Sequence, residues 1–215
     1  MPSIVWSGVG IAIQSAIGAD QAVSAVTKAS PGVATYAGAD PSNGTYVLFK
    51  DVIGMHQLNN RIVRVANVNT GDNTFELEDI DTTNYETWGS GDIAPLTFGL
   101  GLNGVFDVQM SGGEPNFIDD TTIHDLIATE VLTTFTPIAA NFEHRWLPSD
   151  PGLAALEAAT IIKASRGVLF AFSSGAKFVF YGSIACLRLP QGSAQQKVTT
   201  RIGVRGAGFP MAYST

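Results

Sequence analysis

The sequence predicts a mainly β protein with one well-marked helix. Val, Ile, Thr and Phe recur in short runs, and 23 of the 215 residues are glycine, a pattern that favours strands and turns over long helices. Apolar residues make up 45% of the chain and charged residues only 14%, whereas about a quarter is usual in soluble domains. So few charges indicate that the protein hides much of its surface against something else.

The first strand is expected in "VWSGVGIAIQS", which places Val5, Val9, Ile11 and Ile13 on one face. A turn-rich stretch follows, and then come three strand signals: "TYVLFKDV", "NRIVRVANV" and "NTFELEDI". Gly71, Asp72 and Asn73 suit a tight hairpin between the last two. We therefore expect residues 27–92 to form a small all-β module that is inserted into a larger domain.

The larger domain is expected to comprise residues 1–26 and 93–215, because strand signals resume at Ile93. They are "LTFGLGLNGVFDVQM", "IAANFEHRW", "GVLFAFSS", "KFVFYGSIACLRL" and "KVTTRIGVRG". Gly175 in "SSGAK" indicates a hairpin turn.

One helix is predicted after Ser149 or Asp150, either of which can cap it, with Pro151 in the first turn. Helical spacing continues to Ile161, and we expect Gly167 to end the helix. The segment "DDTTIHDLIATEVL" has a second apolar stripe with helical spacing. It fits either a helix or a long loop with a β arm, and the periodicity does not decide between them.

The net charge of −7 is unevenly distributed. Residues 1–157 hold all 19 acidic residues and five of the 12 basic ones, a net −14, and residues 158–215 hold the other seven basic residues. A basic tail can bind nucleic acid, but these cations are spaced singly along strand-like sequence. Two interpretations of these basic residues remain: they occupy solvent-facing strand positions, or they pair with the opposite charge of a neighbouring subunit.

Nothing in the sequence indicates export or a membrane span. The first 27 residues contain no Lys or Arg, and no apolar run approaches ~18 residues. The single cysteine, Cys186, lies in an apolar run and is expected to be buried. We expect synthesis in a reducing cytoplasm.

The glycines of "FGLGLNG", Gly99, Gly101 and Gly104, match a dinucleotide-binding pattern. That site requires a helix N-terminus directly after the glycines, but the strand-like "VFDVQMSGG" follows. The glycines are therefore interpreted as bulges or points of close backbone approach.

No catalytic constellation is predicted. His56, His124 and His144 lack metal-ligand spacing, and the acids beside the last two have no nucleophile in an elbow-like context. The acids of "GGEPNFIDDTTIHD" lack the pattern of a calcium loop. We expect a protein that is not an enzyme and that binds no cofactor or metal.

Two sets of motifs resemble phage tail proteins. Residues 28–88, with "GMHQLN" between two strands and "FELEDIDTT", resemble a small β-module that recurs in these proteins, which places His56 in a structural turn. The order of "DDTTIHD", "WLPSDP", "GSIA" and "KVTTRIGVRG" resembles the major tail tube protein of long-tailed, non-contractile phages. Together the resemblance covers nearly the whole chain.

The resemblance implies a β-sandwich of two sheets with one flanking helix. Six copies would form a ring, with their inner sheets joined into a central β-barrel around a lumen for double-stranded DNA, which passes without specific binding. Rings would stack into the tail tube of the virion through a long loop or hairpin and the termini. The implied partners are the chain itself and the tape measure, tail terminator and distal tail proteins.

Two sets of site residues follow. The region from Glu114 to Val131 is expected to reach between rings, because its apolar stripe has no obvious home within one subunit. The residues of this stripe are Ile123, Leu126, Ile127 and Val131. Asp107 and Glu143 are expected to face the lumen, since strand alternation places them opposite the core side, and the basic residues after 158 would lie mainly at subunit contacts or outside.

A second function remains open, a tail-tip adhesin or carbohydrate-binding protein that uses residues 27–92 to contact the host surface. The aromatic residues for such a sugar site would be Tyr36, Tyr46, Phe75, Tyr85 and Trp88. A hydrolase has only the isolated His–acid pairs in its favour.

Overall fold

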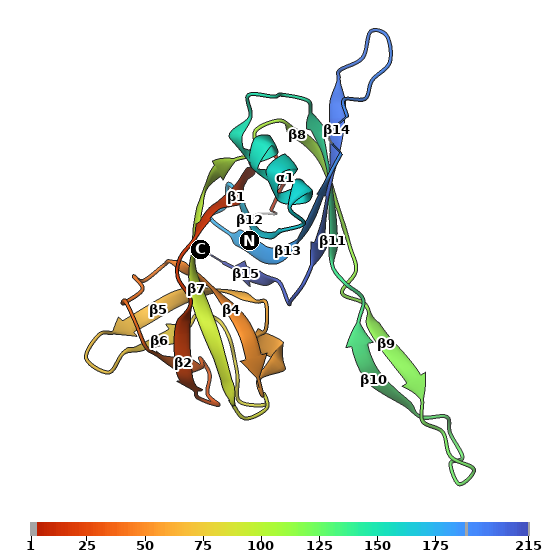
Figure 1. Ribbon diagram of the computed structural model, residues 1–215. Helices are drawn as coiled ribbons and strands as arrows, with labels where there is room; N and C mark the ends of the chain where they lie inside the picture. Colours follow the sequence, from red (N-terminus) through yellow and green to blue (C-terminus); the bar gives the residue numbers. More distant parts are fainter. Residues whose placement is uncertain (1–3, 188, 215) are drawn as a thin grey trace.

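The computed structural model describes residues 4–187 and 189–214 and has a lower barrel, an upper sheet and a projecting arm (Figure 1). Among these residues, strand pairing runs continuously through 13 strands, and two further strands form the arm. The prediction of a mainly β protein with one α-helix is therefore confirmed for the described part of the chain.

The lower half is a closed six-stranded barrel. It closes because β2 pairs with β3 on one side and with the start of β7 on the other. The short 3-10 helix η1 (His56–Leu58) connects two of its strands. The barrel strands are β2 (Gln21–Val26), β3 (Val33–Tyr36), β4 (Tyr46–Ile53), β5 (Ile62–Asn69), β6 (Thr74–Leu77) and the first half of β7 (Ser90–Gly101).

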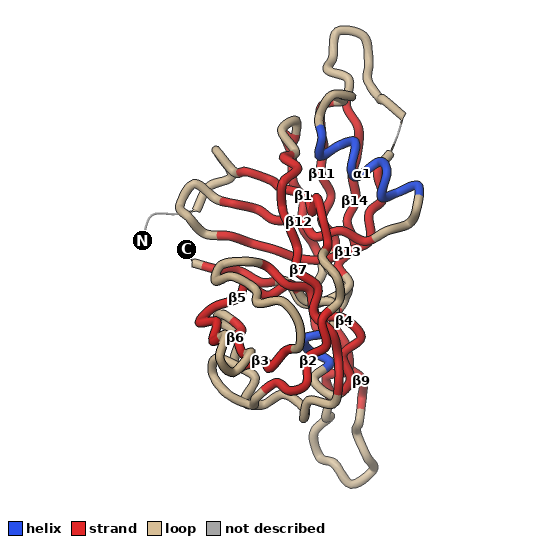
Figure 2. The backbone as a smooth tube through the Cα atoms, turned by 60° about the vertical axis from the view of Figure 1, so that its left-hand side comes forward, coloured by secondary structure: helices blue, strands red, loops and turns tan. Residues whose placement is uncertain are grey.

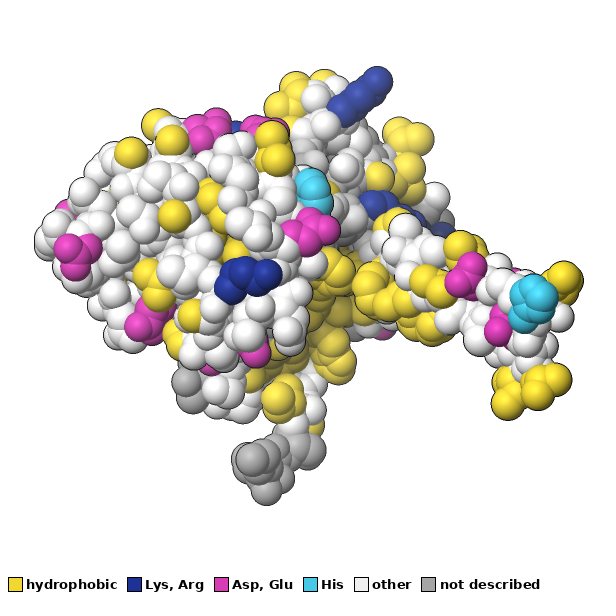
Figure 3. Space-filling model, turned by 90° about the horizontal axis from the view of Figure 1, so that it is seen from below, with side chains coloured by type: hydrophobic (Ala, Val, Ile, Leu, Met, Phe, Trp, Pro, Cys, Tyr) yellow, Lys and Arg dark blue, Asp and Glu magenta, His cyan; other side chains and the backbone are white. Residues whose placement is uncertain are grey.

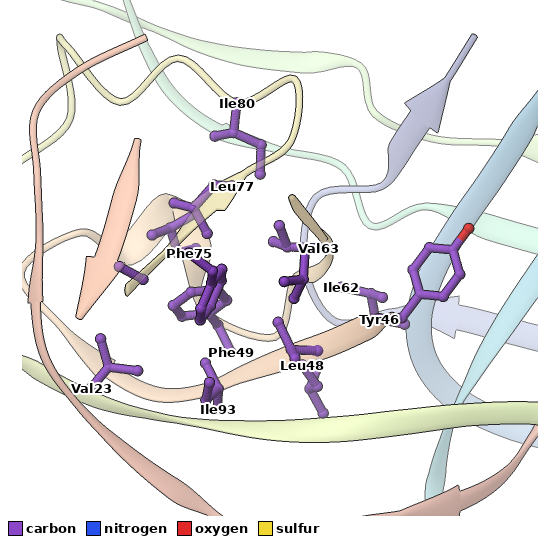
Figure 4. Close-up of a cluster of buried hydrophobic side chains, with 14 of the residues drawn as sticks. Val23, Tyr46, Leu48, Phe49, Ile62, Val63, Phe75, Leu77, Ile80 and Ile93 are labelled. Atoms are coloured by element: carbon purple, nitrogen blue, oxygen red, sulfur yellow. The ribbon is translucent and has the colours of Figure 1, made fainter. Parts of the chain in front are cut away.

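The barrel interior is filled by aliphatic and aromatic side chains, among them Phe49 and Phe75 (Figure 4). Three residues from the upper half, Val179, Met211 and Tyr213, belong to the same buried cluster. The backbone N–H of Arg64 donates to the Tyr213 hydroxyl at 2.7 Å. The two halves therefore share a core, and the barrel takes in β2, which precedes residue 27. Independent folding of residues 27–92 stays a prediction.

The upper half is an open sheet with α1 packed on one face, whereas the strands of the lower half curl into the barrel (Figure 2). β15 (Met211–Tyr213) pairs with the start of β13. In sheet order its strands are the second half of β7, β1 (Gly10–Ile17), β12 (Ser165–Ala171), β13 (Lys177–Cys186), β14 (Thr199–Gly206), β11 (Ala139–Arg145) and β8 (Val105–Ser111).

This arrangement differs from the expected sandwich of two sheets. β7 is 12 residues long, and it pairs with β4 in the barrel and with β1 in the upper sheet. Because one strand serves both halves, the described strands outside the arm form one continuous sheet that closes at one end instead of two stacked sheets.

Helix α1 (Pro151–Ile161) begins as the sequence predicts. Asp150 is the N-cap, and its side chain accepts hydrogen bonds from the N–H groups of Gly152 and Leu153. The helix ends at Ile161, earlier than expected, and Lys163 follows with a positive φ of 53°. Gly167 instead lies inside β12, where a Cβ would approach Ile62 and Phe98 to 3.0 Å. Close packing, not helix termination, explains this glycine.

Four smaller expectations have different outcomes. The N-terminal strand begins at Gly10, later than predicted, and buries Ile11 and Ile13. Gly175 adopts a positive φ in the turn between β12 and β13, and Cys186 is buried, both as expected. Residues 119–132 form a β arm rather than a helix, with β9 (Pro115–Asp119) and β10 (Glu130–Phe135) joined by a loop.

We predict that Tyr213→Phe lowers the free energy of unfolding by about 1 kcal/mol, the usual contribution of one intramolecular hydrogen bond. The change removes the hydroxyl that joins Tyr213 to β5 and retains the ring. Urea denaturation would measure it, with Tyr181→Phe, a half-buried tyrosine of β13, as the control. Equal stability of the two variants would show that this hydrogen bond does not tie the halves together.

Candidate assembly surfaces

The outer face of the upper sheet carries the two acids expected at the lumen. Asp107 of β8 lies directly opposite Glu143 of β11, which lies opposite Arg201 of β14. The alternate residues on these strands, such as Phe142 and Ile202, are buried in the core that includes α1. Asp107 and Glu143 are thus neighbours on the face that points away from this core.

This face is polar and close to neutral. Arg201 Nε lies 3.4 Å from Glu143 Oε1, and Arg205 donates to Asn141 Oδ1 at 3.2 Å. Both arginines therefore share the face with the two acids, a grouping that the sequence analysis did not predict. The alternation of Arg201 and Arg205 with the buried Ile202 and Val204 was the signal that could have found it.

The sheet ends in an open edge at β8. Among the described residues β8 pairs with β11 on one side, and it is the last strand in the sheet order. The backbone N–H and C=O groups on its other side are left for an external partner. An open edge of this kind is a template for pairing with a strand of another chain.

The arm continues from β8 and β11 beyond the sheet and carries the predicted apolar stripe (Figure 1). Ile123, Leu126 and Ile127 lie together in the loop between β9 and β10, and their exposed fractions are 96%, 102% and 81%. Val131 lies on β10 and is about half exposed. Seen from below, the arm extends from the body with hydrophobic groups at its tip (Figure 3).

The arm is also strongly acidic. Residues 112–137 contain five acidic residues and no Lys or Arg. Asp119 and Glu130 lie directly opposite each other on β9 and β10, a like-charge pairing that destabilises a sheet. Hydrogen bonds from Thr121 lower the pKa of Asp119, and those from Thr122 lower the pKa of Asp125. These two carboxylates therefore stay ionised into mildly acidic solution.

Inside the upper half, His144 connects the β7–β8 turn to the start of α1. Gly104 N–H donates to His144 Nε2 at 3.1 Å. Asp150 Oδ2 lies 3.6 Å from the same nitrogen and accepts a hydrogen bond from Asn103 N–H. Burial lowers the pKa of His144, while the nearby Asp150 carboxylate raises it. The arrangement holds a neutral imidazole in a structural role.

The glycines that resembled a nucleotide motif serve this packing. A Cβ on Gly104 would lie 2.6 Å from the His144 ring. Gly101 lies within β7, where its carbonyl oxygen would be 2.7 Å from a Cβ on Gly152. Because β8 and not a helix follows, the nucleotide pattern lacks its helix, and close approach of packed segments explains Gly104.

The other candidate residues lie apart. His56 is exposed beside Glu86 at 3.9 Å, and His124 lies in the exposed arm loop. In the described part of the chain no three His, Cys, Asp or Glu side chains come together as a metal site. Of the aromatic residues considered for a sugar site, Tyr36, Tyr46 and Phe75 are buried in the barrel core, so they do not line an open surface.

These features define a β-rich structural protein with surfaces suited to association. The family model for the phage tail tube protein, TTP, matches residues 53–213, and the chain belongs to that family. A search of curated proteins found no match. Membership implies self-association, contact with other phage tail proteins and a place in the tail of the virion. None of the helices in the described residues is long and apolar enough to cross a membrane.

We predict that the stability of the protein falls as pH drops below about 6.5. The pKa of His144 is lowered in the folded state, so the unfolded chain binds a proton more readily and the free energy of unfolding decreases with falling pH. Urea denaturation between pH 7.5 and 5 would measure the slope. His144→Gln should flatten it, and His56→Gln, at an exposed histidine, should leave it unchanged. An unchanged slope in His144→Gln would contradict the assignment.

Proposed function

We propose that this chain assembles into stacked hexameric rings that form the phage tail tube, the conduit through which DNA is ejected into the host. The observation that carries the proposal is the upper sheet, which is covered by α1 on one face, polar on the other and unpaired at β8. If a segment of the next copy pairs with this edge, repeated copies would build a continuous wall whose polar faces enclose a lumen.

The balanced charge of the polar face suits a wall that DNA slides past. Duplex DNA carries one negative charge per ~1.7 Å, and binding strengthens with the number of cations that neutralise its phosphates. On this face Glu143 offsets Arg201, and Asp107 lies beside them. We assign Asp107 and Glu143, together with Arg201, to the lumen.

The position of the barrel supports an outer location for residues 27–92. In Figure 1 the barrel and α1 lie on the same side of β11 and β14, and the polar face points the other way. If that face encloses the lumen, the barrel lies outside the wall. The arm, whose three aliphatic tip residues are almost fully exposed, would then reach from one ring to the next.

Electron microscopy of the purified protein tests the proposal. We predict hollow tubes for the wild type and folded protein that forms no tubes for Ile123→Ser/Leu126→Ser, because the arm loses its apolar contacts. Ile53→Ser is the matched control, since Ile53 is 62% exposed and lies on the barrel. Discrete monomers or trimers of wild-type protein would instead support the tail-tip adhesin, and tubes of the arm variant would contradict the role of the arm.

The lumen assignment has a separate test. We predict that Asp107→Lys/Glu143→Lys tubes retain duplex DNA at low salt and release it at high salt, because the changes raise the net charge of the wall by four per subunit. Retention would be measured against ionic strength. Asp72→Lys/Glu86→Lys adds the same charge to exposed barrel positions and should retain less DNA inside the tubes. Unchanged passage in the first variant would rule out the assignment.

A further inference from the structure

The end of the upper sheet opposite the arm carries a second exposed apolar surface. β11 and β14 pair from Ala139 and Arg205, next to the arm, to Arg145 and Thr199, at the other end. We call the hydrophobic residues around this other end the upper surface. The side chains that form it are exposed by 38% to 70%: Trp146, Leu147, Ile161, Ile162, Leu189 and Val198.

Hydrogen bonds connect the segments that carry this surface. Trp146 N–H donates to Val198 O at 3.0 Å, which joins the end of β11 to the start of β14. Cys186 N–H donates to Thr160 Oγ1 at 2.9 Å, which joins the last turn of α1 to the end of β13. Ile161 and Ile162 follow Thr160 with exposed fractions of 60% and 67%. The surface is therefore supported by three elements of the sheet and by the helix.

The upper surface and the arm are both apolar, and the charges around them are opposite in sign. Arg145, Lys163 and Lys197 are exposed at this end of the molecule. The acids near the upper surface are less exposed than these cations, because Asp150 is buried as the cap of α1 and Glu157 is half-buried on the helix. The arm carries the opposite charge. It has three exposed aliphatic side chains among five acids and no basic residue.

We infer that the upper surface is the receptor for the arm of a second copy of this chain. Ile123, Leu126 and Ile127 of one copy would pack on the isoleucines and on Trp146 of the next, and the arm carboxylates would pair with Arg145, Lys163 and Lys197. The inference rests on the proposed tube and identifies the surface that joins one ring to its neighbour.

Two physical features favour this partner. A contact between different patches at opposite ends of a molecule is heterologous, and it produces an open filament when the rotation between copies does not close. The arm also holds Asp119 opposite Glu130 within one subunit, and cations from a neighbour would relieve that repulsion. The upper surface of a second copy offers cations, which the arm lacks, next to apolar residues that can cover the arm's own.

Two variants, each defective at one end, test the inference. The arm variant is Ile123→Ser/Leu126→Ser/Ile127→Ser, the receptor variant is Ile161→Ser/Ile162→Ser, and Ile53→Ser is the control. We expect neither variant to form sedimenting tubes alone. When the two variants are mixed in equal amounts, the intact arm of the receptor variant should bind the intact upper surface of the arm variant. Growth should stop at this single junction because the other two ends are defective. Analytical ultracentrifugation should then detect a species of twice the mass of the separate assemblies.

The outcomes distinguish this inference from the proposed function. Wild-type tubes, no tubes from the arm variant and normal tubes from the receptor variant would overturn the receptor assignment and leave the tube proposal intact. Failure of the two variants to combine would also overturn it. Absence of tubes from wild-type protein would count against the proposed function itself.

A charge exchange provides a second test that leaves the apolar residues in place. Asp119→Lys/Asp120→Lys in the arm and Lys163→Glu/Lys197→Glu at the upper surface should each reduce tube yield at low salt, because each creates like-charge contacts. Combining the four changes in one chain should restore the yield, since opposite charges meet again. If the combined variant is folded, as judged by circular dichroism, and its yield is no higher than that of either double variant, the arm docks elsewhere.

Discussion

The structure depends on the sharing of β7 between two different pairings. Its first half closes the barrel with β2 and β4, and its second half pairs with β1 in the upper sheet. A closed barrel has no free edge, so closure at this end leaves β8 as the free terminal strand of the continuous sheet among the described residues. Tyr213 reinforces the junction from the C-terminal side by entering the barrel core and binding Arg64. The position of the assembly edge is thus a consequence of where the sheet closes.

Local features of this fold could be predicted from sequence, and long-range ones could not. Asp150 and Pro151 specify the start of α1 because capping involves neighbouring residues, and Gly175 specifies its hairpin in the same way. The division of β7 depends on partners at residues 12–17 and 46–53, which no local pattern encodes. The stripe from Ile123 to Val131 fits a helix and an exposed loop equally well. Which one forms depends on whether the subunit offers a surface for the stripe to pack against, and the sequence does not show that.

The candidate surfaces show the same limit. Alternation along single strands was enough to place Asp107 and Glu143 on the face opposite the core. That Glu143 lies between Asp107 and Arg201 follows from strand register, which the sequence does not show. Sequence alone therefore suggested an acidic face, whereas the register of three adjacent strands places Arg201 beside the two acids and makes the face nearly neutral. His144 was interpreted as structural from sequence, but its hydrogen bond from Gly104 joins residues 40 positions apart and could not be predicted from the local pattern.

The uneven charge of the chain acquires a different meaning in three dimensions. The acidic segment includes the arm, which extends from one end of β11, and the basic segment includes the loop before β14, at the other end. Along the strands between them, Glu143 and Arg201 come from opposite segments and offset each other. Opposite charges therefore offset each other between neighbouring strands, whereas along the strands the acidic arm and the basic loop lie at opposite ends. Separation of opposite charges along an axis favours head-to-tail contact between identical subunits, and a face with balanced charge binds a polyanion weakly. One sequence asymmetry can thus serve both the growth of a polymer and passage through it.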